Sequence, residues 1–298
     1  MHMKKIGLLF GCIVQFIPFT YAQTTLSQLE TAIRNEFARS PGTFALAFQE
    51  LKTPAHTLLI NEKETFHAAS TMKAPVMAEV YKQAKQKQFK LQDSLLVKNE
   101  FRSIVDGSPF SLSESDDSEP ELYRKIGQKS SIYDLMYDMI IYSSNLATNI
   151  IIELVDARKV NQSMRDMGAM DIQVLRGVED TKAFQQGKNN TTTAYDLMLL
   201  FNQIAHGKMV SKKASKGMMN ILLDQKFNDA IPAKLPTGVR VAHKTGWITQ
   251  VRHDAGIVLL PDGRSYVLIL LSKKWESDEL ATEIMANTSR LIYDFVTQ

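Results

Sequence analysis

The chain of 298 residues is long enough to bury one large core or two modest ones. Its apolar fraction of 44% and charged fraction of 22% are typical of a soluble globular protein and argue against long disordered regions. The net charge of +3 comes without a basic face or stripe, so we expect no nucleic-acid partner.

The first residues have the pattern of a secretory signal peptide. Lys4 and Lys5 precede a largely apolar stretch, and Ala22 offers a small residue before Gln23. We therefore expect residues 1–22 to be removed on export, which leaves a secreted or periplasmic protein without a membrane attachment. A retained membrane anchor and lipidation at Cys12 are the alternatives. Cys12 is the only cysteine, so the exported chain would have neither disulfides nor thiol chemistry.

Strands and one helix are predicted before residue 66. Apolar residues at helical spacing indicate a helix from Leu26 that ends before Ser40-Pro41-Gly42. Residues 43–51 and 57–60 form two short apolar runs that predict strands.

The middle of the chain, from about residue 70 to residue 223, has a helical pattern. Apolar faces begin near residues 132, 146 and 194, and Ser130 or Ser131 is a suitable N-cap for the first of these helices. Residues 114–121 include five acidic side chains. We interpret this acidic run as a solvated loop rather than a calcium site, because the spacing of calcium ligands is missing. The six histidines also lack the spacing of a zinc site on one helix, so we expect no metal.

Strand character returns after His243. Residues 256–260 and 265–272 are apolar runs joined by Pro261-Asp262-Gly263, a favourable hairpin turn, and residues 279–296 predict a long final helix. This order predicts an α+β fold, in which an antiparallel sheet flanked by the N- and C-terminal helices lies beside an all-α lobe. We place the sheet lobe at about residues 23–65 and 233–298 and the helical lobe at about 66–232, within one catalytic domain of residues 23–298. A cleft between two such lobes is a natural place for a small-molecule site.

Ser70 and Lys73 form an S-x-x-K motif at a predicted helix start. Residues three apart share one face of a helical turn, and Pro75 is tolerated only near the beginning of a helix. The backbone N–H groups at that end favour developing negative charge. A lysine partly removed from water loses its proton more readily and can act as a base toward the serine. Alone, the motif more often marks a capping serine and a solvated lysine.

Two further motifs follow in the chain. Ser143-Ser144-Asn145 lies in the break between two predicted helices, where a hydroxyl can relay a proton and an amide can hold a substrate amide. Lys244-Thr245-Gly246 opens the returning strands, where Lys244 and Thr245 can meet a carboxylate and Gly246 permits close backbone approach. Taken singly, these motifs are typical of an N-cap and of a strand end with a solvated lysine.

The three motifs together, in this order, carry a stronger signal than any one of them. The set resembles the penicillin-recognising superfamily of serine hydrolases and, more closely, its class A β-lactamases. The resemblance covers about residues 23–298 and includes the order of helices and strands. It implies acyl-enzyme chemistry without a cofactor, a β-lactam as the small-molecule partner, and a monomer.

The resemblance also implies roles for individual residues. Ser70 would be the nucleophile, Lys73 its proton partner, and Ser143 the donor of a proton to the leaving nitrogen. Six residues would bind substrate: Asn145, Lys244, Thr245, Gly246, Trp247 and Arg252. Asn145 would hold the side-chain amide, Lys244 and Thr245 the carboxylate, and the N–H groups of Ser70 and Trp247 the oxyanion. Arg252 is an additional carboxylate counter-ion or, equally, a salt-bridge partner at the surface. We assign no catalytic role to His253, since Lys73 supplies the base.

Glu179 is similar in placement to the glutamate that activates the hydrolytic water in class A enzymes. A carboxylate beside Lys73 would be held ionised by that positive charge. The surrounding loop is slightly shorter than usual, Ala183 stands where an asparagine is usual, and Asn190 replaces the acidic residue that usually pairs with the loop arginine. Ser144 replaces an aspartate common in the second motif, a change that we interpret as structural. Glu179 could instead be a loop carboxylate in a local salt bridge.

The sequence therefore predicts a secreted serine β-lactamase that is acylated on Ser70 and deacylated by a Glu179-activated water. The alternatives are a DD-peptidase-like or other amidase or esterase, or a penicillin-binding sensor with slow deacylation. We find no candidate span beyond the signal region and the chain ends directly after its last helix, which disfavours the sensor and the peptidase.

Overall fold

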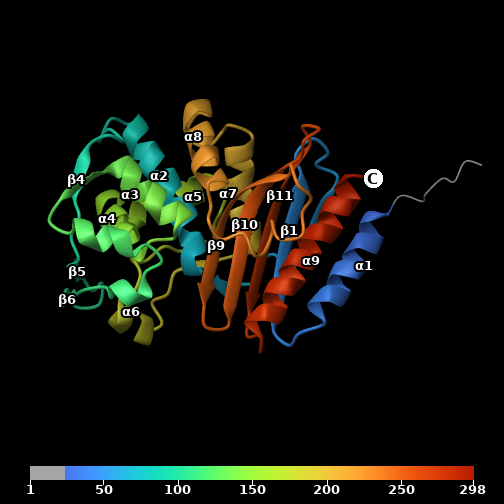
Figure 1. The fold of residues 1–298 in the computed structure, drawn as a ribbon, viewed down its shortest axis with the longest axis horizontal. Helices are drawn as coiled ribbons and strands as arrows, with labels where there is room; N and C mark the ends of the chain where they lie inside the picture. The colour runs from blue at the N-terminus through green and yellow to red at the C-terminus, as the bar shows by residue number, and fades with distance from the viewer. Residues whose placement is uncertain (1–23) are drawn as a thin grey trace, which may run out of the picture.

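The computed structural model describes residues 24–298 and has a mixed α+β fold (Figure 1). The predicted signal peptide and Cys12 lie outside the described residues. Within residues 24–298, no helix combines the length and the apolar character that crossing a membrane requires.

The two ends of the chain build one five-stranded antiparallel sheet, in the order β2-β1-β11-β10-β9. Its strands are β1 (Thr43–Glu50), β2 (Thr57–Ile60), β9 (Arg240–Ile248), β10 (Val251–Leu259) and β11 (Ser265–Lys273). The first strand pairs with the last, and Thr43 lies opposite Lys273. The predicted turn at residues 261–263 joins β10 to β11, but β10 begins at Val251, five residues before the apolar run that predicted it. β9 is left as an edge strand.

Side chains alternate between the two faces of the sheet along each strand, and helices cover both faces, so both are buried. Leu46, Phe48 and Leu268 belong to a core with helices α1 (Leu26–Phe37) and α9 (Asp278–Val296), which lie side by side over one face (Figure 1). Ala45 and Ile269 belong to a second core, which includes α7 (Ala194–Ala205) on the opposite face. The middle of β1 and of β11 is therefore a continuous apolar run rather than an alternation with polar residues, whereas β9 and β10 also carry the buried polar residues Lys244 and His253.

The middle segment forms the helical part of the molecule, at the left of Figure 1. Its further helices are α2 (Lys73–Lys85), α3 (Ile132–Ile141), α4 (Asn145–Val155), α5 (Ala157–Asp166), α6 (Thr181–Gln185) and α8 (Lys212–Leu223). Three 3₁₀ helices accompany them: η1 (Ala69–Met72), η2 (Glu114–Asp116) and η3 (Pro120–Lys125). Ser131 caps α3 as predicted, and Ser144 and Thr193 cap α4 and α7.

Short strand pairs interrupt this helical segment, which the sequence analysis expected to be entirely helical. They are β3 (Phe66–His67) with β8 (Thr191–Thr192), β4 (Ser94–Leu96) with β7 (Lys129–Ser131), and β5 (Phe101–Arg102) with β6 (Pro109–Phe110). Elements of two or three residues are too short to show a period of two, so the pattern could not predict them. The β3–β8 pair matters for the site, because it ties the segment before Ser70 to Thr192.

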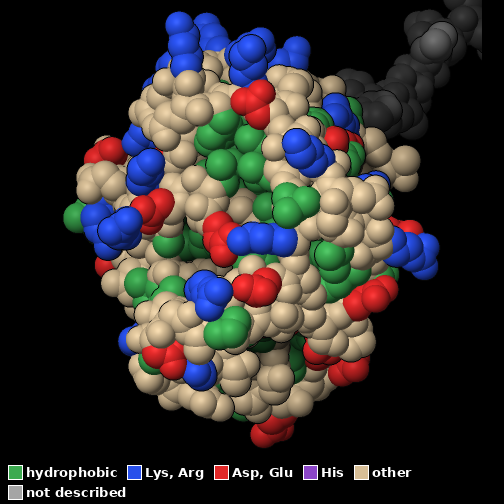
Figure 2. Space-filling model, turned by 90° about the vertical axis from the view of Figure 1, so that its left-hand side faces the viewer, with side chains coloured by type: hydrophobic (Ala, Val, Ile, Leu, Met, Phe, Trp, Pro, Cys, Tyr) green, Lys and Arg blue, Asp and Glu red, His purple; other side chains and the backbone are tan. Residues whose placement is uncertain are grey.

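The outer end of the helical part carries a mixed surface. Figure 2 shows Lys and Arg side chains gathered along its upper edge, while acidic and basic side chains alternate over the rest of this face. Hydrophobic side chains lie singly or in small groups between them, as is normal for a protein surface.

We predict that Ile292→Ala destabilises the fold by removing packing between α9 and the sheet. Ile292 is fully buried in the core that α1 and α9 share with the sheet. The expected loss in the free energy of unfolding is about 2–5 kcal/mol, measured by urea denaturation. Asp294→Ala is the matched control, because Asp294 is exposed and pairs only with Arg290 on the same helix, so its loss should stay within about 0.5 kcal/mol. Equal effects of the two substitutions would contradict this packing.

Candidate active site

Ser70 lies in the 3₁₀ helix η1, and α2 begins at Lys73, one turn later than the sequence analysis placed the helix start. Pro75 then occupies the first turn of α2, where its missing N–H costs no hydrogen bond. Ala69, directly before Ser70, has a left-handed backbone with φ of 45°. The nucleophile candidate therefore sits on a tight, strained turn between β3 and α2.

Two buried lysines meet at one serine hydroxyl. The Lys73 Nζ donates to Ser143 Oγ at 3.2 Å and to the Ser143 carbonyl at 2.7 Å, and the Lys244 Nζ reaches the same Oγ at 3.1 Å. Both lysines have no exposed surface. The structure thus brings together Lys73, Ser143 and Lys244, one from each predicted motif.

Burial governs the protonation of these lysines. It lowers the pKa of Lys73 to about 7, although the charges of Asp117 and Glu179 act in the opposite direction. Burial also lowers the pKa of Lys244 well below its usual range, the charge of Lys73 lowers it further, and Asp254 opposes both effects. A pKa near neutrality suits Lys73 to accept a proton at physiological pH.

Asn145 links the lysine pair to the glutamate. Its side-chain oxygen accepts from Lys73 Nζ at 3.0 Å, and its nitrogen donates to Glu179 Oε1 at 2.7 Å. Ser144, between Ser143 and Asn145, is buried and caps α4 by accepting from the Ala147 N–H. The structural interpretation of Ser144 agrees with this placement.

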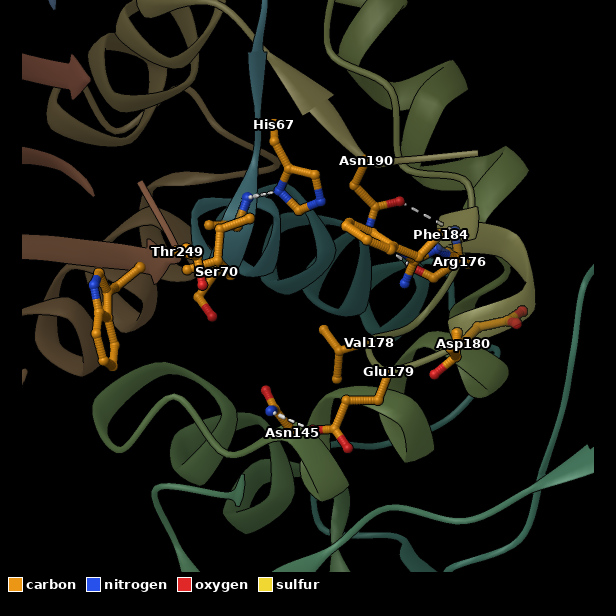
Figure 3. A pocket seen from close by; sticks show the side chains of 14 residues that line it. His67, Ser70, Asn145, Arg176, Val178, Glu179, Asp180, Phe184, Asn190 and Thr249 are labelled. Atoms are coloured by element: carbon orange, nitrogen blue, oxygen red, sulfur yellow. Dashed lines mark hydrogen bonds between the residues drawn. The ribbon is translucent and has the colours of Figure 1, made fainter. Parts of the chain in front are cut away.

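Glu179 is half-buried and points toward Asn145 from the opposite wall of the cavity to Ser70 (Figure 3). Burial raises its pKa, and Asp117 and Asp116 raise it further, whereas the Asn145 hydrogen bond and Lys73 lower it. Lys73 does lower the pKa of this carboxyl, as expected, but burial has the larger effect and the net shift is upward. The ammonium group is directed at Ser143 and Asn145, so its charge does not offset desolvation of the carboxyl.

The loop that carries Glu179 is here called the glutamate loop (residues 176–190). The neutral side-chain amide of Asn190 joins the two ends of this loop. Asn190 Oδ1 accepts from the Leu175 and Arg176 N–H groups at 2.8 and 3.2 Å, and its nitrogen donates to the Arg176 carbonyl at 3.0 Å. Arg176 donates to backbone carbonyls of Lys188 and Gly177 and forms no ion pair with any residue in the described range. The usual arginine–carboxylate pair is thus replaced by hydrogen bonds that fasten both ends of the loop.

Asn149 fixes the loop from the side of α4, and the sequence analysis missed it. Its side chain exchanges two hydrogen bonds with the backbone of Val178, donating to the carbonyl at 3.0 Å and accepting from the N–H at 2.7 Å. A Cβ atom on Gly177 would lie 2.2 Å from Asn149 Oδ1, so the contact requires glycine there. The available signal was the spacing of Asn145 and Asn149, four residues apart on one helix face.

Ser70 lies where two cavities meet. One, of about 380 Å³, is lined by Asn145, Glu179 and Phe184 among others (Figure 3). The other, of about 660 Å³, is lined by Ser143, Thr245 and Arg252 among others. Ser70, Asn145 and Trp247 line both. Gly246 of β9 is so close that a Cβ there would lie 3.1 Å from the Ser70 nitrogen, and Trp247 stands 62% exposed at the rim.

Arg252 has features of both roles that the sequence left open. It lines the second cavity together with Thr245, and its guanidinium forms ion pairs with Asp229 and Asp278. Because strand partners directly opposite share a face, its pairing with Trp247 places its side chain on the face that Thr245 also uses. Its charge is already neutralised by two carboxylates in this structure.

Within residues 24–298, no group of three His, Cys, Asp or Glu side chains could hold a metal ion. The site as built offers a serine on a strained turn, a base of lowered pKa, a hydroxyl between two cations and a carboxyl held by an amide. This set can perform acyl transfer to a serine.

Comparison with known proteins gives the family. A family model described as the β-lactamase enzyme family matches residues 28–296. The chain belongs to the β-lactamase enzyme family. A β-lactamase from Bacteroides uniformis is 28% identical over 177 residues, which cover 55% of this chain and 60% of that protein. The alignment therefore spans less than two thirds of that relative.

Solved structures support the same placement. The structure of PBP-A has a TM-score of 0.78 and 27% identity, covering 93% of this chain and 99% of that one. A mutant of PBP-A, with the same coverage and identity, was solved as an acyl-enzyme complex with penicillin G. The β-lactamase from Sphaerobacter thermophilus has a TM-score of 0.77 at 23% identity, covering 90% and 96% of the two chains, and shows the likeness of fold.

His253 is a second residue whose part in this β-lactamase-family site was missed. Its ring is fully buried on β10, and Nε2 lies 2.9 Å from the carbonyl oxygen of His67, while Nδ1 lies 3.2 Å from the Ser272 nitrogen. His67 Nδ1 in turn accepts from the Ala69 N–H at 3.0 Å. His253 therefore supports the strand that leads into Ser70, and only the fold, which brings β10 against β3, reveals this.

We predict that His253 makes the fold less stable in mild acid. Burial lowers its pKa from 6.5 to about 4, more than its hydrogen bonds to the His67 and Arg252 carbonyls raise it. The unfolded chain therefore takes up a proton between these pH values and the folded chain does not. The stabilisation is complete above pH 6.5 and falls by up to about 1.4 kcal/mol per pH unit toward pH 4.

The test compares free energies of unfolding at several pH values for the wild type and His253→Gln. The glutamine cannot titrate, so the variant should lose less stability than the wild type as the pH falls. Parallel curves for the two proteins would show that His253 does not titrate in this range.

Proposed function

We propose that this chain is a class A-like serine β-lactamase. The substrate acylates Ser70, and Glu179 is the base in the hydrolysis of the resulting acyl-enzyme. The observation that supports it most is the Ser143 hydroxyl held between Lys73 and Lys244, in the wall of a cavity that Ser70 also lines. Membership of the β-lactamase enzyme family and the penicillin G complex of a PBP-A mutant support the same chemistry.

In the proposed acylation, neutral Lys73 accepts the Ser70 proton while Oγ attacks the lactam carbonyl carbon. The Oγ–C bond forms, and the lactam C–N bond breaks with its electron pair on nitrogen. Ser143 passes its hydroxyl proton to that nitrogen and is reprotonated from a neighbouring lysine. The N–H groups of Ser70 and Trp247 stabilise the oxyanion, and each such donor is typically worth about 10²–10³ in rate. Lys244 and Thr245, with Arg252 near them, hold the substrate carboxylate.

In the proposed deacylation, Glu179 takes a proton from a water that attacks the ester carbonyl. The ester C–Oγ bond then breaks, the proton held by Glu179 returns to Ser70 Oγ, and the opened acid leaves. Asn145 holds Glu179 at 2.7 Å and faces the same cavity as Ser70, so its amide also lies where a substrate side chain would enter. Export to the periplasm or medium is part of this proposal and rests on the sequence of residues 1–22.

A second candidate is a penicillin-binding acyltransferase or DD-peptidase-like enzyme that deacylates β-lactams slowly. Ala183 favours it, because this buried residue has no amide to help Glu179 position a water. The 27% identity to PBP-A also favours it.

We predict that Ser70→Ala abolishes acylation, because it removes the oxygen that forms the ester. Intact-mass spectrometry of the purified protein with excess benzylpenicillin should show a penicilloyl adduct on the wild type and none on the variant. An adduct that decays as product accumulates supports the β-lactamase, and one that persists supports the second candidate. Labelling of Ser70→Ala at the wild-type rate would contradict the assignment of the nucleophile.

We predict that Glu179→Gln separates the two half-reactions. Glutamine can keep the contact with Asn145 but cannot accept the water proton, so acylation should stay fast while deacylation slows by about 10²–10⁴-fold. Stopped-flow acylation and the decay of the isolated adduct measure the two steps. Glu100→Gln is the matched control, since Glu100 is exposed and pairs with Arg102 outside both cavities. Unchanged decay in Glu179→Gln would eliminate Glu179 as the base.

A further inference from the structure

One carboxylate of the acidic run is buried behind the active site, contrary to the prediction of a solvated loop. Asp117 follows η2 and is 8% exposed. Its Oδ2 accepts from the Leu146 N–H at 2.8 Å, the Tyr123 hydroxyl at 3.2 Å and the Ser144 hydroxyl at 3.3 Å, and its Oδ1 accepts from the Glu119 N–H at 3.0 Å. Four hydrogen bonds thus hold this side chain, and two of them, from Leu146 and Ser144, join it to the first turn of α4 and its cap.

These contacts flank the residues that do the chemistry. Ser144 and Leu146 are the neighbours of Asn145 on either side, so fixing both fixes the Asn145 backbone. Ser143, one residue earlier, has a left-handed φ of 59°. Such a conformation costs about 1–3 kcal/mol in a non-glycine residue and persists only where the surroundings enforce it. The carboxylate also lies at the N-terminus of α4, where the helix dipole favours negative charge.

Asp117 also contributes charge to the lysine pair. The charged groups that act on Lys73 are Asp117 and Glu179, which raise its pKa, and Lys244, a second cation bound to the same Ser143 hydroxyl. Asp117 places beside Ser144 the carboxylate that the serine side chain itself lacks. The carboxylate comes from a segment 27 residues earlier in the chain.

We propose that Asp117 is a positioning residue that replaces a carboxylate within the turn, holding Ser143 and Asn145 against Lys73 and supplying negative charge near Lys73. The effect on acylation rests on the proposed function, whereas the effect on Lys73 does not. Asp117 itself touches no reacting atom and acts through Ser144, Leu146 and the charge of Lys73.

The decisive experiment follows the titration of Lys73 by NMR in protein with ¹³C-labelled lysine, with Lys73→Arg to assign the signal. Asp117→Asn keeps the shape of the side chain and removes its charge. The pKa of Lys73 should fall below the wild-type value, because the protonated form loses a stabilising anion. Glu121→Gln is the matched control from the same acidic run, since Glu121 is exposed and pairs with Arg124, and it should leave the titration unchanged. An unchanged Lys73 pKa in Asp117→Asn would overturn the proposal.

The kinetic arm measures benzylpenicillin acylation by intact mass. Asp117→Ala should acylate about 10- to 100-fold more slowly, as expected for a loss of positioning. The double variant Asp117→Ala/Ser144→Asp, which returns a carboxylate to the turn, should recover most of that rate. Asp117→Ala at the wild-type rate would overturn the positioning role. Absence of an adduct on the wild type would instead contradict the proposed function, and the Lys73 titration would still decide the charge contribution of Asp117.

Discussion

The site depends on two lysines buried against a single hydroxyl. Lys73 and Lys244 both lie within 3.2 Å of Ser143 Oγ and neither is exposed. Two full charges this close repel by several kcal/mol at the effective dielectric constant of a protein interior, about 20. The fold responds in two ways, by lowering the pKa of both lysines through burial and by placing carboxylates around them, with Asp117 and Glu179 acting on Lys73 and Asp254 on Lys244. Repulsion and burial thus both favour the neutral form of each lysine, and the carboxylates oppose them.

Holding this arrangement requires backbone conformations that the sequence does not favour locally. Ala69, Ser143 and Glu179 all have φ between 45° and 62°, and each belongs to a different element of the site. Left-handed backbone in such residues is costly and collects at functional sites. Here the cost is offset by contacts from outside each turn: His67 beneath Ala69, Asp117 behind the S-x-N turn, and Asn149 beside Glu179. The residues around the site are thus needed to hold its backbone, just as the residues that line it are needed for the chemistry.

The sequence predicted the elements and motifs better than the contacts between them. The sheet built from both chain ends, the capping of α3 by Ser131 and the α+β class followed from hydrophobic periodicity and cap residues, and the fold confirms them. The motif residues Lys73, Ser143 and Lys244 meet as expected. The roles of Asp117 and His253 in the site were not predicted, because the residues that they contact there are far along the chain and no local pattern marks them. The upward net shift of the Glu179 pKa was not predicted for a related reason, since desolvation depends on packing that only the folded chain defines.

The repulsion between the two lysines gives the proposed reaction an order of events. In the resting site Lys244 carries no carboxylate partner of its own among its hydrogen bonds, which go to Ser143 Oγ and the Thr245 carbonyl. A substrate carboxylate bound beside Lys244 and Thr245 would favour the charged form of Lys244. Because the two ammonium groups repel, the same event would disfavour the charged form of Lys73. Substrate binding would then deliver the neutral base at the moment when Ser70 has a carbonyl to attack, so that anion recognition at one motif activates the nucleophile at another.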